Sequence, residues 1–387
     1  MGTKLKKDFI NKEKINSVIL GLFLSTPMIT KLITSVVVIG NNVVLFIGAL
    51  LAYSMFINRN RTISLKFVLI NISIITAFAL SLFFNTDITY TTNYFLNFIL
   101  YGTAGMLLCS VEFNNTKVMK TISIVFIFFS ILTLFVYIPM AKDILYMERS
   151  MDVSYTIVIG LSASVFTWKH FSKIFRILIT LAILVSCYYL FFLSDSRGAI
   201  LALVFLFGSL LLKRSKHKIF WTLVFVLLIV FVVSGWDSIL DALANSNSEM
   251  RWVSRFRRST DVLSGRDGLS SQAQELILNN IFGKGIGYFE SLANGSYTHN
   301  LFLQLMCEFG VFVGGAISIY IVFSVLKSLL SKHDNELSIF CICQFIPRLL
   351  LSSVYWSNPF IWIFLYSQNS KSNTNNNIDI GGTIKHT

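Results

Sequence analysis

Charged residues are scarce in this sequence, and their scarcity excludes a soluble globular protein. Only 13% of the 387 residues are charged, while 55% are hydrophobic, whereas soluble domains carry about 25% charged residues. The sequence also lacks the short segments of alternating hydrophobicity, each about ten residues long, that build a transmembrane β-barrel. Several apolar runs instead approach or exceed the roughly 18 to 20 residues that cross a bilayer as a helix. The expected fold class is therefore an all-α polytopic membrane protein.

Cysteine is also rare, and its distribution gives no disulfide framework. The five cysteines fall in or beside apolar runs, as is typical of small core residues. Cys341 and Cys343 are two positions apart, so on a helix they point to different faces and suit a metal poorly. The lysines near the N-terminus precede an apolar run without a small-residue cleavage site, so we expect this run to remain as an uncleaved first helix.

Basic residues outnumber acidic ones, giving a net charge of +13. In a membrane protein the first explanation is an excess of Lys and Arg in cytoplasmic loops, so we expect no nucleic-acid partner. Most of these residues fall in one set of alternate loops, which predicts twelve transmembrane helices with both termini cytoplasmic. The helices are expected at about 16–39, 42–57, 64–84, 89–111, 120–140, 153–168, 173–193, 197–212, 218–235, 299–326, 337–355 and 358–368.

This pattern divides the chain into four parts. Residues 1–234 hold helices 1–9, and residues 235–298 form a large extracytoplasmic loop with short amphipathic helices. Residues 299–368 hold helices 10–12, and the Ser/Asn-rich tail at 369–387 is typical of a cytoplasmic disordered segment.

The large loop contains "RWVSRFRRSTDVLSGR", with five arginines and no lysine. On a helix, Arg251, Arg255 and Arg258 form one stripe beside an apolar one. This pattern fits a helix that lies on the membrane surface and touches lipid headgroups. It fits an anion site equally well, because the planar guanidinium group binds phosphate through two parallel hydrogen bonds.

Further polar residues stand where predicted helices begin on the same side of the membrane. Arg197 follows Ser194, Asp195 and Ser196, any of which can cap a helix. Its guanidinium group either reaches to the membrane surface or faces a cavity as a functional charge. Two more charges, Lys31 and Arg348, fall inside predicted helices.

His299 and Asn300 open the tenth predicted helix. His299 is either a structural residue or a general base. Glu308, nine positions on, is either a bonded core carboxylate or a proton-linked group. Before them, the glycines of "GKGIG" predict a tight turn, and they lack the strand and helix context of a nucleotide-binding loop.

Three of these stretches together resemble the O-antigen ligase and polymerase superfamily. "SDSRGAILAL" resembles its Ser-Arg-Gly/Ala signature, "SGR" with "NNIFGKGIGYF" its Gly-Arg and Asn-Pro-Phe-Gly-x-Gly run, and "THNLFLQLMCEFGVFVGG" its His-Asn helix. The resemblance covers roughly residues 190–320. Ile281 stands where the family usually has Pro, and Val313 stands where Gly is expected.

The resemblance implies a GT-C-like helical fold that transfers glycan from an undecaprenyl-pyrophosphate carrier, without a metal or other cofactor. It places this reaction at the outer face of the bacterial cytoplasmic (inner) membrane. Arg197 and Arg266 are expected to contact the pyrophosphate, because guanidinium groups stabilise the charge of a departing diphosphate. His299 is expected to deprotonate or orient the acceptor hydroxyl. Arg251, Arg255, Arg258 and Asn300 are expected to bind substrate.

Two activities within this superfamily remain open. A Wzy-type polymerase joins carrier-linked repeat units of O-antigen or capsule, and a ligase transfers the glycan to lipid A–core. We favour the polymerase, because it must hold two carriers and the sequence is rich in outer arginines. The resemblance further implies membrane lipid, a chain-length regulator and a flippase as partners. A transporter or flippase is disfavoured because no matching half is evident, and a non-enzymatic scaffold leaves the His–Arg constellation unexplained.

Overall fold

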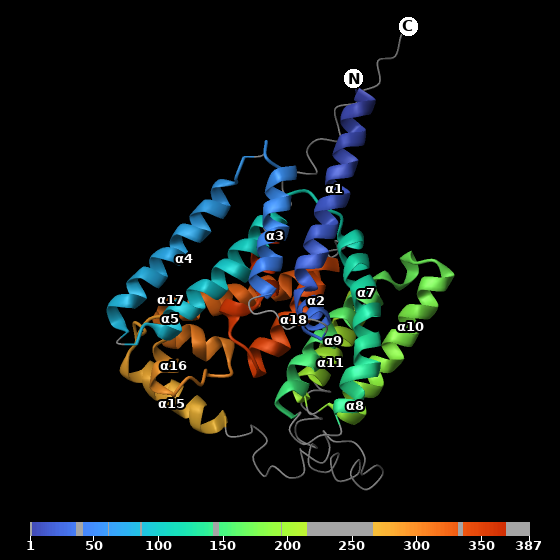
Figure 1. The fold of residues 1–387 in the computed structure, drawn as a ribbon. Coiled ribbons are helices and arrows are strands. Elements are labelled where there is room, and N and C mark those ends of the chain that lie inside the picture. Colours follow the sequence, from blue (N-terminus) through green and yellow to red (C-terminus); the bar gives the residue numbers. More distant parts are fainter. Residues whose placement is uncertain are drawn as a thin grey trace.

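The computed structural model describes residues 2–35, 42–60, 62–85, 87–141, 147–194, 196–214, 266–331 and 336–368, and these residues form a bundle of helices without a β-strand (Figure 1). The first half contains α1 (Gly2–Leu24), α2 (Thr26–Thr34), α3 (Asn42–Ile57), α4 (Leu65–Phe84), α5 (Thr89–Asn97), the π-helix η1 (Phe98–Thr103), α6 (Ala104–Cys109), α7 (Asn115–Leu132), the π-helix η2 (Thr133–Tyr137) and α8 (Ile138–Met140). The second half contains α9 (Met147–Thr167), the 3-10 helix η4 (Trp168–His170), α10 (Lys173–Tyr188), the π-helix η5 (Tyr189–Leu193), α11 (Arg197–Arg214), α15 (Arg266–Asn279), α16 (Tyr288–Leu292), α17 (Leu301–Leu330), α18 (Glu336–Leu351), the 3-10 helix η6 (Tyr355–Ser357) and α19 (Pro359–Ser367).

The all-helical prediction is confirmed for the described residues. Five of their helices are long and apolar enough to cross a membrane, or up to six if a bent pair counts as one span. Each predicted transmembrane segment in this part of the chain coincides with a helix or a run of helices. The segment predicted at 218–235 and residues 235–265 of the large loop lie outside the described residues, so the count of twelve stays a prediction.

One predicted segment differs in shape from the expectation. The apolar run at 16–39 was expected to be a single helix, but the chain bends by 65° between α1 and α2. Pro27 occupies the first turn of α2, where its missing N–H costs nothing, although the same residue cannot continue α1. Ser25 lies at the bend, and its hydroxyl donates to the carbonyl of Gly21 at 2.7 Å.

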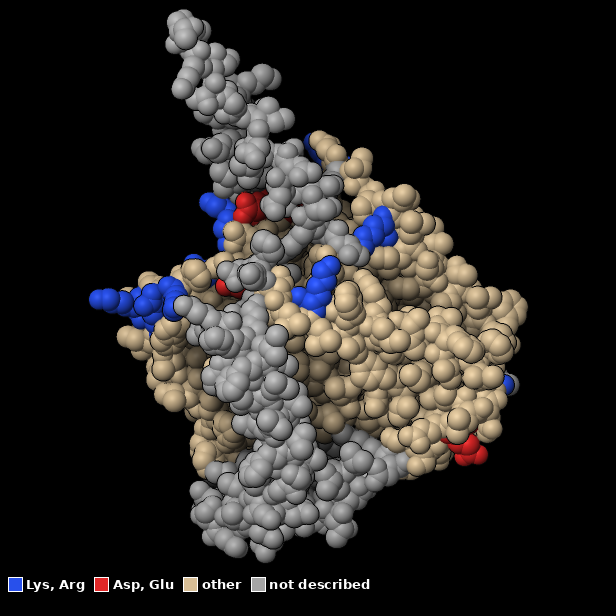
Figure 2. Space-filling view, turned by 180° about the vertical axis from the view of Figure 1, so that it is seen from behind, with Lys and Arg blue, Asp and Glu red and all other residues tan. Residues whose placement is uncertain are grey.

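The centre of the bundle is α7, which packs against α1, α9 and α10. Small residues allow these helices to approach closely, as is common between helices in membranes. A Cβ on Gly160 would collide with Phe126, and a Cβ on Gly21 would collide with Thr121. Large hydrophobic side chains lie on the outward faces of the bundle; Phe83 of α4, for example, is 85% exposed. Figure 2 shows few charged side chains over the described part of the rear surface, as expected of a face turned to lipid.

The loops predicted to be cytoplasmic gather at one end of the bundle. Lys117, early in α7, lies 3.2 Å from Glu13 of α1. Lys66 of α4 donates to the carbonyl of Tyr366 in α19 at 2.6 Å. Asn58, just after α3, donates to an asparagine of α1 at 2.9 Å. Figure 1 shows the start of α1 at the top and α15 and α16 at the bottom, so the helix mouths singled out in the sequence lie at the opposite end.

Candidate functional site

The glycine turn predicted from "GKGIG" docks into a break in α17. Gly283, Gly285 and Gly287 all have positive φ angles, which confirms the tight turn. Gly310 interrupts the helical geometry of α17 with φ 77° and ψ 173°. The backbones at Gly283 and Gly310 approach so closely that a Cβ on either glycine would collide with backbone atoms of the other segment. Both positions therefore require glycine.

Backbone hydrogen bonds join the turn to the broken helix. The N–H groups of Lys284 and Gly285 donate to the carbonyls of Cys307 and Glu308, each at 3.0 Å, and a third bond of 2.8 Å joins the N–H of Val311 to the carbonyl of Ile281. The break at Gly310 leaves carbonyls of α17 without helical partners, and the turn supplies N–H groups to them. The loop is thus fastened to the helix that begins beside His299.

His299 is held in an unusual backbone conformation at the mouth of α17. Its φ angle is +54°, a region that non-glycine residues seldom occupy and that often marks functional sites. The imidazole ring lies 4.0 Å from the ring of Tyr297, centroid to centroid. Nδ1 lies 3.2 Å from the carbonyl oxygen of Leu351, the last residue of α18. Because a carbonyl only accepts, Nδ1 donates this bond, and in a neutral ring Nε2 is then the basic nitrogen.

Asn300 caps the helix that follows. Its Oδ1 accepts from the N–H groups of Phe302 at 2.9 Å and Leu303 at 3.4 Å, which satisfies donors left open at a helix N-terminus. This cap explains where α17 begins and why His299 sits just outside it. The predicted contact between Asn300 and substrate remains a prediction.

A buried polar network supports the segment before His299. Gln304 donates to Glu290 at 2.9 Å and to Glu308 at 2.6 Å, and its Oε1 accepts from the hydroxyl of Thr298 at 3.2 Å. Tyr94 of α5 donates to the same Oε1 of Glu290 at 2.8 Å. Glu308, which the sequence left as either a core carboxylate or a proton-linked group, is a buried and bonded carboxylate; proton linkage stays a prediction. Thr298 adjoins His299, so the network positions the histidine.

A small pocket lies beside this network. The hydroxyl of Tyr355, which lines the pocket, donates to Glu308, and the indole N–H of Trp356 donates to the same carboxylate at 3.4 Å. The lining of the pocket consists of Tyr297, Thr298, Asn300, Leu301, Gln304, Ser353, Val354 and Tyr355.

The start of α11 reaches the same end of α18 as His299 does. Ser196 caps α11, because its hydroxyl accepts from the N–H of Ala199 at 3.3 Å, as the sequence predicted. Gly198 packs against the hydroxyl of Tyr155, where a Cβ would collide. That hydroxyl donates to Ser352, one residue past α18, at 2.9 Å. Residues 351 and 352 thus join His299 to the helix that begins at Arg197.

The structure describes only the backbone of two of the arginines singled out in the sequence. Arg197 and Arg266 are the first residues of α11 and α15, but their side chains lie outside the described part. Arg251, Arg255 and Arg258 lie outside the described residues altogether. The contacts expected between the first two arginines and a pyrophosphate, and between the other three and substrate, therefore remain predictions.

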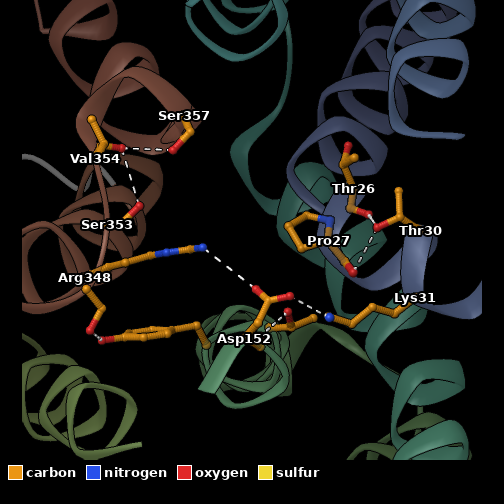
Figure 3. Close-up of polar contacts among 12 residues, drawn as sticks. Thr26, Pro27, Thr30, Lys31, Asp152, Arg348, Ser353, Val354 and Ser357 are labelled. Atoms are coloured by element: carbon orange, nitrogen blue, oxygen red, sulfur yellow. Dashed lines mark hydrogen bonds and ion pairs between the residues drawn. The ribbon is translucent and has the colours of Figure 1, made fainter. Parts of the chain in front are cut away.

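Other members of the site were missed in the sequence. Gln304 stands four positions after Asn300 and four before Glu308, so these three share a helix face, and this spacing could have found it. Glu290 carries no such signal, because only folding brings α16 to α17. The charge cluster of Lys31, Asp152 and Arg348 was also missed, although Lys31 and Arg348 had been noted as charges within predicted helices. Figure 3 shows both cations reaching Asp152.

Burial raises the pKa of the Glu290 carboxyl, and hydrogen bonds from Tyr94 and Gln304 offset part of that effect. A raised folded-state pKa contributes stability that is fully present below the unfolded value, about 4.3, and is lost as pH rises through the folded pKa. Glu290→Gln keeps Oε1, the acceptor for both bonds, without a charge. We expect the melting temperature of the purified wild type to fall relative to this variant as pH rises.

The control for this experiment is Asp87→Asn. Asp87 is exposed, and its hydrogen bonds with Thr89 lower its pKa, so its contribution is lost as pH falls instead. If the melting temperatures of wild type and Glu290→Gln changed in parallel with pH, the raised pKa assigned to Glu290 would be contradicted.

Comparison with known proteins gives a family match but no match to a curated protein. Residues 180–318 match the family model of the O-antigen ligases. The matched region runs from within α10 to within α17, and it includes Arg197, Arg266 and His299. The match confirms the resemblance found in the sequence: residues 180–318 of this chain are similar to the O-antigen ligases.

Proposed function

We propose that the protein is a polymerase of undecaprenyl-pyrophosphate-linked oligosaccharide repeat units, as in O-antigen or capsule synthesis. The match of residues 180–318 to the family model of the O-antigen ligases supports glycan transfer of the polymerase or ligase type. The observation that carries the proposal is the convergence at the end of α18, where Leu351 contacts His299 and Ser352 contacts Tyr155 beside the start of α11. His299, the proposed base, therefore lies near the start of α11, where Arg197 stands.

The proposed location is the bacterial cytoplasmic membrane, with both termini in the cytoplasm and this convergence at the outer face. The clustering of Glu13, Lys66 and Lys117 at the opposite end of the bundle supports this orientation, because basic loops remain cytoplasmic. A lipid-linked sugar presents its pyrophosphate at headgroup depth, which is where a helix mouth lies.

The proposed reaction is a direct displacement at the anomeric carbon of the donor. Nε2 of His299 takes the proton of an acceptor hydroxyl, the hydroxyl oxygen bonds to the carbon, and the bond from that carbon to the diphosphate oxygen breaks. The electron pair of the broken bond leaves with the diphosphate. A single displacement inverts the anomeric configuration. Arg197 and Arg266 stabilise the charge that grows on the leaving group, which is the task that a divalent cation performs in other enzymes.

The second candidate is a ligase, and the description of the matched family favours it. Both activities use the same donor and leaving group, so the acceptor separates them. Two accessory proteins, a chain-length regulator and a flippase, are proposed partners of the polymerase.

The test is elongation by the purified protein. Supplied only with a carrier-linked repeat unit in the presence of EDTA, a polymerase is expected to yield a ladder of longer carrier-linked products with an inverted linkage. A ligase gives product only when lipid A–core is added, and a transporter gives no longer product under either condition. Activity that is lost with EDTA and restored by magnesium would overturn the metal-free mechanism. In cells, loss of a polymerase leaves single repeat units on the core, whereas loss of a ligase leaves carrier-bound chains and a bare core.

A further inference from the structure

Three helices bring one charged residue each to a single point near the proposed site. Lys31 of α2 lies 2.6 Å from Asp152 of α9, and Arg348 of α18 lies 3.9 Å from the other oxygen of the same carboxylate. Figure 3 shows Lys31 and Arg348 approaching Asp152 from opposite sides. The cluster has two cations and one anion, so one positive charge is left over. Charges at membrane depth are costly and usually functional.

The guanidinium group of Arg348 has unused hydrogen-bonding capacity. Its buried Nε has no hydrogen-bond partner, although a guanidinium group carries five N–H donors and unpaired buried donors are costly. Its contact with Asp152 is long for an ion pair. The group lies 5.3 Å above the centre of the Tyr155 ring, which holds its plane. The side chain of Arg348 is 28% exposed, so an anion can reach the exposed part of its guanidinium group.

Tyr155 connects this cluster to the proposed catalytic residues. One face of its ring lies below Arg348, and its hydroxyl packs against Gly198, the residue after Arg197. Leu351, which contacts His299, follows Arg348 by less than one helical turn. The extra positive charge is therefore linked to the start of α11 through Tyr155, and to the histidine through the last turn of α18.

Building on the proposed function, we infer that Arg348 and Lys31 bind the diphosphate of the lipid-linked donor. A diphosphate carries two phosphoryl groups, and Arg348 offers a planar donor pair for one of them. Asp152 is a positioning residue: it holds the two cations at a common point and is displaced in part when the more highly charged diphosphate arrives.

Binding of inorganic pyrophosphate to the full-length purified protein tests this inference. Arg348→Gln and Asp152→Asn each break the same ion pair, but only the first removes a cation. Arg348→Gln is expected to weaken pyrophosphate binding about tenfold or more. Asp152→Asn is expected to bind at least as tightly as wild type, because it removes a competing anion. Arg348→Lys keeps the charge without the planar fork, so an intermediate affinity is expected.

Lys117→Gln is the matched control, because it breaks an ion pair between α1 and α7 at the other end of the bundle; its affinity is expected to equal that of wild type. The inference is overturned if wild type does not bind pyrophosphate, if Arg348→Gln binds it normally, or if Arg348→Gln and Asp152→Asn weaken it equally, as a purely structural ion pair predicts. The proposed function is tested apart from this. If the wild type elongates glycan and Arg348→Gln still binds pyrophosphate normally, only the inference fails. If pyrophosphate binding depends on Arg348 but the wild type does not elongate glycan, only the proposed function fails.

Discussion

His299→Ala is expected to abolish glycan elongation, with a loss of about 10² to 10⁴ in rate, the usual contribution of a positioned general base. The bond from Nδ1 to the carbonyl of Leu351 orients the ring and leaves Nε2 as the basic nitrogen. Alanine removes the base but leaves the helix cap of Asn300 in place, so the protein is expected to insert and accumulate normally. The measurement is the initial rate of elongation of a carrier-linked repeat unit.

His170→Ala is the control for this variant. His170 is exposed in η4, after α9, and its replacement is expected to leave the elongation rate unchanged. A wild-type rate in His299→Ala, at equal protein levels, would show that the acceptor hydroxyl loses its proton elsewhere.

Arg197→Ala is the second large effect, with an expected loss of about 10² to 10³ in rate, as for the removal of one preorganised donor to a developing charge. Arg197→Lys is expected to recover only part of this loss, because an ammonium group cannot make the two parallel hydrogen bonds of a guanidinium group. The cap by Ser196 and the packing of Gly198 against Tyr155 do not require the Arg197 side chain. The helix should therefore survive both changes.

Arg176→Ala provides the comparison for a surface arginine. Arg176 donates to the backbone carbonyls of Phe171 and Lys169 at the start of α10, in a loop set predicted to be cytoplasmic. Its loss is expected to leave elongation intact. If Arg197→Ala and Arg176→Ala elongate equally well, the leaving diphosphate is stabilised by other groups.

The positions of the helices could be predicted from the sequence because a lipid-embedded chain must satisfy its backbone groups within each segment. Apolar runs therefore mark helices directly. The bend between α1 and α2 could not be predicted in this way, because the apolar run continues through Ser25 and Pro27 although the backbone turns there. The break in α17 could not be predicted for the same reason, since Gly310 interrupts the geometry and not the hydropathy.

Part of the candidate site could likewise be predicted from the sequence, and part could not. His299 and the start of α11 at Arg197 could be singled out because each follows a polar segment and opens a long apolar run. The contacts that assemble the site could not, because Lys31, Asp152 and Arg348 lie far apart in the chain and meet only through the packing of α2, α9 and α18. The pairing of Glu290 with Gln304 likewise depends on where α16 comes to rest.

The bonds between the glycine turn and the break in α17 fix the register of residues 281–285 against residues 307–311. Inserting or deleting one residue within either segment would move donors past their acceptors. In related chains we therefore expect gaps in alignment to fall outside these two segments, and their lengths to be inherited more faithfully than the identity of most of their side chains.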